Sequence, residues 1–87
     1  MKLEVIQVDA WREPEGSWIY NDCIPITTIE VKEPTPRRLL KALRNENLLG
    51  QKSNFTIDDY LDYDGIWTVL YRGTAEPLYD LKEIKDE

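Results

Sequence analysis

The sequence predicts an α+β fold in which one helix covers a mainly antiparallel sheet of about five strands. Apolar residues alternate with period two along most of the chain, which is typical of strands. Only residues 34–47 combine helix-start signals with a 3.6-residue apolar period. Turn residues separate these segments, so the expected order is β-β-α-β-β-β. The 87 residues suit a single domain, expected over residues 1–84, with residues 85–87 as a free tail.

The first strand is expected over residues 2–12. Its apolar positions are odd at Leu3 and Val5, and they become even from Ile6 onward. This change of phase indicates either a strand covered on both faces or a bulge that switches its inward side.

A hairpin and a second strand are expected next. Residues 13–16, Glu-Pro-Glu-Gly, have the chemistry of a turn. The returning strand is expected to start near Ser17 and to be interrupted at residues 21–22. Pro25 lacks a ladder donor and predicts an edge position or a break. Residues 26–32 are rich in β-branched side chains, which favours a further strand.

The helix is expected to begin after Thr35, which can cap it, with Pro36 in the first turn. It is expected to run to about Asn47, with Gly50 as the stop. The helical period separates an apolar side from a basic side. The apolar side holds Leu39, Leu40 and Leu43, and the basic side holds Arg37, Lys41 and Arg44, with Arg38 beside them.

Three short strands are expected after the helix, over residues 55–61, 66–71 and 78–84. Asp64-Gly65 is a hairpin signal between the first two, and residues 72–77 form a longer connection before the last. One alternative stays open. Residues 56–59 have capping-box spacing, which is also consistent with a short helical turn.

The net charge of −6 is unevenly distributed. Residues 1–53 contain eight basic and eight acidic residues, whereas residues 54–87 contain three basic and nine acidic residues. The C-terminal part would repel phosphates, so the composition does not favour a general polyanion binder.

Four short stretches span most of the chain: Asp9-Ala10-Trp11, the Trp-Ile-Tyr-Asn-Asp box at 18–22, the helical residues 36–43, and residues 74–79 before the last strand. Together they resemble a loosely defined group of small uncharacterised proteins encoded by bacteriophages and bacterial mobile DNA. The resemblance implies a phage gene and a bacterial cytoplasm, and it implies no activity. A cytoplasmic location is also expected because Cys23 is the only cysteine and no run of about 20 apolar residues exists.

The sequence predicts a protein that is not an enzyme and that needs no cofactor or metal. The absence of histidine excludes Ser–His and Cys–His nucleophile pairs. Cys23 adjoins Asp22, which does not activate a thiol. The aspartates at 58–64 do not match a calcium loop, because tyrosines occupy its first and twelfth positions. The four glycines are dispersed, so no phosphate-binding loop is present.

The preferred hypothesis is a protein-binding module that acts through the acidic, aromatic C-terminal sheet, as an inhibitor that occupies a basic surface of a host protein would. Its expected contact residues are Asp58, Asp59, Asp62, Asp64, Trp67, Tyr71 and Tyr79. The alternative is nucleic-acid binding through the basic helix side. That site would use Arg37, Arg38, Lys41 and Arg44. A homodimer formed through an exposed strand edge is a further expectation.

Overall fold

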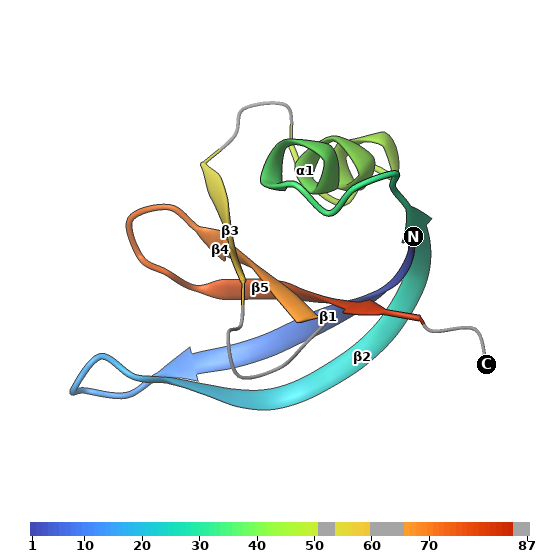
Figure 1. Ribbon diagram of the computed structural model, residues 1–87. Helices are drawn as coiled ribbons and strands as arrows, with labels where there is room; N and C mark the ends of the chain where they lie inside the picture. Colours follow the sequence, from blue (N-terminus) through green and yellow to red (C-terminus); the bar gives the residue numbers. More distant parts are fainter. Residues whose placement is uncertain (51–53, 60–65, 85–87) are drawn as a thin grey trace.

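The computed structural model describes residues 1–50, 54–59 and 66–84, and it confirms the predicted α+β fold and the order of its elements (Figure 1). The strands pair in the order β2-β1-β5-β4-β3, and every neighbouring pair is antiparallel. The elements are β1 (Lys2–Arg12), β2 (Trp18–Glu30), α1 (Pro36–Asn45), β3 (Phe55–Asp59), β4 (Ile66–Tyr71) and β5 (Pro77–Glu83).

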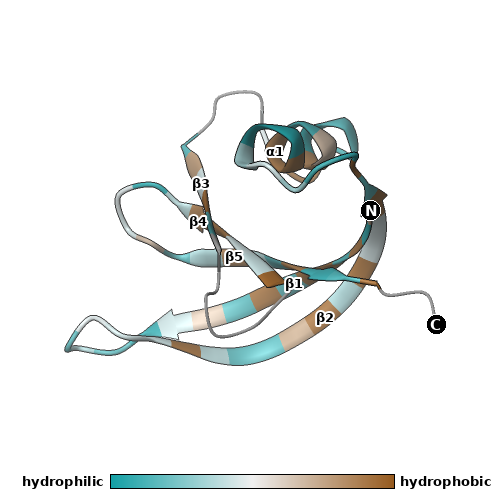
Figure 2. Ribbon diagram, viewed as in Figure 1, coloured by the Kyte–Doolittle hydropathy of each residue, from teal (hydrophilic) through white to brown (hydrophobic). Residues whose placement is uncertain are grey.

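Helix α1 connects the two outer strands, β2 and β3, and lies over one face of the sheet (Figure 1). Leu39 and Leu43 are fully buried between the helix and the sheet. The strands beneath the helix supply the other side of this core. In Figure 2, hydrophobic residues, coloured brown, occur both on α1 and on the strands beneath it. The buried core consists of Leu3, Val5, Ile29, Val31, Leu39, Leu43, Leu49, Phe55, Val69 and Leu81.

Both ends of α1 follow capping chemistry. Thr35 is the N-cap, as predicted, and its side chain accepts a hydrogen bond from the Arg38 amide at 3.4 Å. At the other end Asn47 has φ of 60°, and the Leu48 amide donates to the Leu43 carbonyl at 3.0 Å. This pattern is a Schellman motif. The prediction of Gly50 as the stop is therefore wrong, because Asn47 takes the left-handed position three residues earlier.

The β1–β2 hairpin is long and strongly curved (Figure 1). Its turn is the predicted one, with Gly16 at φ of 101°. Strand β2 is continuous, so the predicted interruption at residues 21–22 is wrong. The register shifts instead between Asp9 and Ala10, which leaves Asn21 as the extra residue of a bulge. Pro25 lies on an edge strand, as predicted.

Of the two predicted alternatives for β1, the structure supports a strand covered on both faces. β1 pairs with β5 without a register shift from Leu3 to Gln7, so the buried Val5 and Val8 lie on opposite faces. The register shift between Val5 and Ile6 leaves Ile26 of β2 as the extra residue. Beyond the shift, toward its turn, the hairpin is not covered by α1. Its other face contacts the β4–β5 connection, where Trp18 Nε1 donates to the Thr74 carbonyl at 3.3 Å. The covered face of β1 therefore changes along the strand.

The C-terminal strands agree with the prediction where the structure describes them. Residues 56–59 belong to β3, which excludes the helical turn. Strand β5 begins and ends one residue earlier than predicted. The expected strand end at Leu61, the Asp64-Gly65 hairpin and the tail at residues 85–87 lie outside the described residues. Within the described part of the chain, no helix has the length and apolar character needed to cross a membrane.

Candidate anion-binding groove

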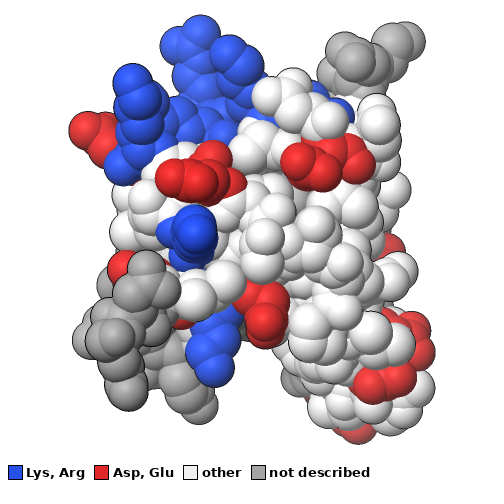
Figure 3. All heavy atoms as spheres, turned by 90° about the vertical axis from the view of Figure 1, so that its right-hand side faces the viewer, with Lys and Arg blue, Asp and Glu red and all other residues white. Residues whose placement is uncertain are grey.

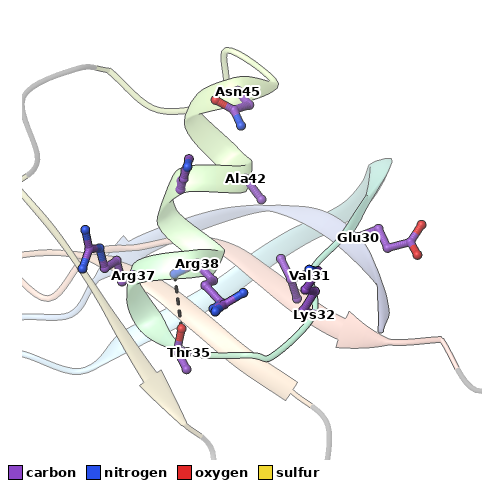
Figure 4. Close-up of a pocket in the computed structure, with 9 residues that line it drawn as sticks. Glu30, Val31, Lys32, Thr35, Arg37, Arg38, Ala42 and Asn45 are labelled. Carbon is purple, nitrogen blue, oxygen red and sulfur yellow. Dashed lines mark hydrogen bonds between the residues drawn. The ribbon is translucent and has the colours of Figure 1, made fainter.

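A groove of about 540 Å³ runs between α1 and the segment that leads from β2 into the helix (Figure 4). The lining residues are mostly polar, and basic side chains dominate them. They are Glu30, Val31, Lys32, Thr35, Arg37, Arg38, Lys41, Ala42 and Asn45. The groove thus extends from the end of the edge strand β2 along almost the full length of α1.

The short connection from β2 to α1 fixes one wall of this groove. Met1 and Val31 are linked in both directions, because the Val31 amide donates to the Met1 carbonyl and the N-terminal ammonium donates to the Val31 carbonyl. Val31 is also buried in the core. Pro34 and Pro36 restrict the backbone on either side of the Thr35 cap. Lys32 is consequently held beside the first turn of α1.

Four cations and one carboxylate line the groove, which gives a formal local charge of +3. Figure 3 shows basic side chains gathered over α1 at the top of the molecule. Among the described residues, none of the four cations forms an ion pair. Their charges are therefore available to an external anion.

The placement of Arg37 and Arg38 works against the stability of the helix. Both occupy the first turn, where the helix macrodipole is positive, and that turn contains no acidic residue. Each cation at this end costs about 0.3–1 kcal/mol at low salt. No ion pair within the described part of the chain offsets this cost. Departures from a local rule without internal compensation are expected at functional sites.

The cations do not converge on one point. Figure 4 shows Arg38 reaching from the first turn toward Val31 and Lys32, whereas Arg37 points to the other side of that turn. The helix that lines the groove has 10 residues, which corresponds to a length of about 15 Å. A single small anion cannot contact charges spread in this way, but a chain of phosphates can.

The structure places three of the four residues predicted for nucleic-acid binding in this groove. Arg44 is different, because it is half-buried and its Nε atom is enclosed without a hydrogen-bond partner among the described residues. Sequence reasoning missed Lys32 and Asn45. Lys32 precedes the helix cap by three residues, and its proximity to the basic side depends on how sharply the chain turns from β2 into α1.

The residues predicted for protein binding do not form one surface. Trp67 is half-buried and packs against the core. Tyr79 is also half-buried, and its hydroxyl donates to the Leu48 carbonyl. Tyr71 is exposed, and its ring lies 5.0 Å from that of Phe55.

The predicted acidic contact residues fall mainly outside what the structure describes. Asp58 is exposed in β3, and Asp59 lies in the same strand. Asp62 and Asp64 lie outside the described residues. Only Asp58 and Tyr71 of the predicted set are thus placed as exposed side chains.

A second polar cluster lies on the sheet around Asp80. Burial raises the pKa of this carboxyl group, and hydrogen bonds from Thr68 and Tyr20 oppose the rise without cancelling it. The pKa of the exposed Cys23 thiol is also raised, by desolvation and then by the charges of Asp80 and Asp22. A raised pKa disfavours the nucleophilic thiolate. In the described part of the chain, no three His, Cys, Asp or Glu residues gather as metal ligands would.

Comparisons with protein-family models, with curated proteins and with solved structures found no match.

Proposed function

We propose that the protein is a non-catalytic module that binds nucleic acid through the phosphate backbone, using the groove along α1. One observation carries the proposal: four cations line one groove and form no ion pair with the residues that the structure describes. They are Lys32, Arg37, Arg38 and Lys41. Lysine and arginine contacts to phosphates supply most of the sequence-independent affinity of nucleic-acid binders.

The net charge of −6 does not oppose this use of the groove. Charges are screened over a Debye length of about 8 Å at physiological ionic strength. The molecule measures 40 Å along its longest axis, so acidic groups far from α1 contribute little at the groove. The local charge governs the approach of a phosphate.

A protein partner on the acidic C-terminal sheet, the preferred expectation from sequence, has weaker support. Of its three aromatic contact residues, Trp67 and Tyr79 contribute to the packing of the fold. The origin in a phage or mobile element and the role as an inhibitor stay predictions.

The test is a binding titration, by fluorescence anisotropy, with a short fluorescein-labelled DNA duplex and with one of its single strands. Replacing Arg37, Arg38 and Lys41 by glutamate is expected to weaken binding by at least about tenfold. The matched control replaces three exposed cations outside the groove, Arg12, Arg72 and Lys82, by glutamate. It changes the net charge by the same amount as the groove variant. Equal weakening by both triple variants, or no binding by the parent protein, would contradict the proposal.

A further inference from the structure

The distal half of the β1–β2 hairpin carries an exposed face that the groove does not use. Residues directly opposite each other in an antiparallel pair project from the same face. Three such pairs follow one another along the hairpin, at alternate positions of β1, and all six side chains are exposed. These residues, called the hairpin patch below, are Gln7 with Ile24, Asp9 with Asp22, and Trp11 with Ile19.

The hairpin patch holds the two most exposed large apolar side chains among the described residues. Ile24 is 52% exposed and Trp11 is 51% exposed. The opposite face of the hairpin is anchored, because Trp18 donates to the Thr74 carbonyl. The hairpin patch is thus exposed to solvent, while the opposite face of the hairpin is attached to the β4–β5 connection. Exposed apolar and aromatic residues gathered on one surface are a property of interaction sites.

Two carboxylates lie in the middle of the patch. Asp9 and Asp22 are direct cross-strand partners, and like charges in this position destabilise a sheet. Asn21 donates to Asp9 at 3.1 Å, and the Cys23 amide donates to Asp22 at 2.9 Å. Each carboxylate retains further acceptor sites. A guanidinium placed between them would offset the repulsion and donate several hydrogen bonds.

The order of the pairs defines the chemistry of the occupant. Successive pairs are two residues apart, or about 7 Å, so Ile24 lies on one side of the carboxylates and the Trp11–Ile19 pair lies on the other. Four acidic residues and one cation occur between residues 9 and 22. The surface is therefore complementary to a basic side chain flanked by apolar ones.

Charge also selects among the classes of occupant. Nucleic acid would bring phosphates against the two carboxylates. A second copy docked about a two-fold axis through the middle of this patch would place its own Asp9 and Asp22 against the same pair. Only a cationic occupant removes the electrostatic conflict.

We propose that the hairpin patch docks a basic segment of a protein partner, in which an arginine is flanked by large apolar side chains. This site is independent of the nucleic-acid groove, so either proposal can fail without the other.

The probe is a fluorescein-labelled peptide in which arginine alternates with leucine, titrated by fluorescence anisotropy. Replacing both Asp9 and Asp22 by asparagine is expected to weaken binding by about tenfold or more, and Ile24→Ser is expected to weaken it as well. The matched control, Glu33→Gln with Asp58→Asn, removes two exposed carboxylates elsewhere and is expected to change affinity by less than about twofold. Circular dichroism checks that every variant is folded.

Three results would overturn the proposal. The first is that the parent protein binds the peptide no better than a version with glutamate in place of arginine. The second is that the control pair weakens binding as much as the Asp9 and Asp22 pair. The third is a dimer of the peptide-free protein, detected by analytical ultracentrifugation and abolished by Ile24→Ser, which would assign the patch to a second copy.

Discussion

The Tyr79 hydroxyl donates a hydrogen bond to the Leu48 carbonyl at 3.2 Å and so ties the segment after α1 to strand β5. Tyr79→Phe removes this bond and keeps the ring, so it is expected to lower the free energy of unfolding by about 1 kcal/mol. Chemical denaturation measures the change. Tyr71→Phe is the control, because the exposed Tyr71 hydroxyl makes no hydrogen bond with the described residues. Equal stability of the two variants would refute a structural role for the Tyr79 hydroxyl.

Ala75 lies in the connection between β4 and β5 with φ of 58°, in the left-handed region. This conformation costs a residue with a β-carbon about 1 kcal/mol or more. Ala75→Gly is therefore expected to raise the melting temperature, although glycine also gains freedom in the unfolded chain. Ala10→Gly, near the end of β1, is expected to lower it. A decrease on Ala75→Gly would contradict the assigned backbone conformation.

Asp80 is predicted to make stability depend on pH. Its pKa is raised in the folded protein from the ordinary 3.8, so the folded state holds the proton more tightly and ionisation costs stability. This cost is complete above the raised pKa and disappears as the pH falls below the ordinary value. Asp80→Asn is therefore expected to gain most over the parent protein at neutral pH, with a difference that shrinks toward about pH 4. Urea titrations across this range test the trend, and a difference that grows in acid would contradict it.

The elements of the fold were predictable because strong local signals coincide with them. Thr35 and Pro36 start α1, and Gly16 closes the first hairpin, as capping and turn chemistry require. The stop of α1 was not predictable from glycine positions, because Asn47 also tolerates the left-handed conformation. The continuity of β2 was missed because a bulge absorbs Asn21 without ending the strand.

The candidate site was predictable only in part. The helical period brings Arg37, Arg38 and Lys41 to one side of α1, which a sequence reveals. Lys32 joins them through the chain reversal after β2, which depends on tertiary structure. The aromatic residues were harder to place, since alternation on β4 does not say which face α1 covers. Trp67 consequently packs on the core instead of facing solvent.

Lys32 provides a test of the groove that sequence reasoning did not supply. Lys32→Ala is expected to weaken DNA binding several-fold and to reduce the salt dependence by about one phosphate contact. Lys82→Ala, an exposed cation on β5, is the matched control and is expected to have little effect. The same anisotropy titration measures both. Identical affinities for the two variants would remove Lys32 from the site.

The most direct test of the phosphate-binding groove is the dependence of duplex DNA affinity on salt. Four cations that each neutralise a phosphate predict a slope of roughly −3 to −4 for the logarithm of the association constant against the logarithm of salt concentration. The slope of the Arg37, Arg38 and Lys41 charge-reversal variant should fall to about −1, the contribution of the remaining Lys32. A parent slope near zero, or a variant slope equal to that of the parent, would contradict the account.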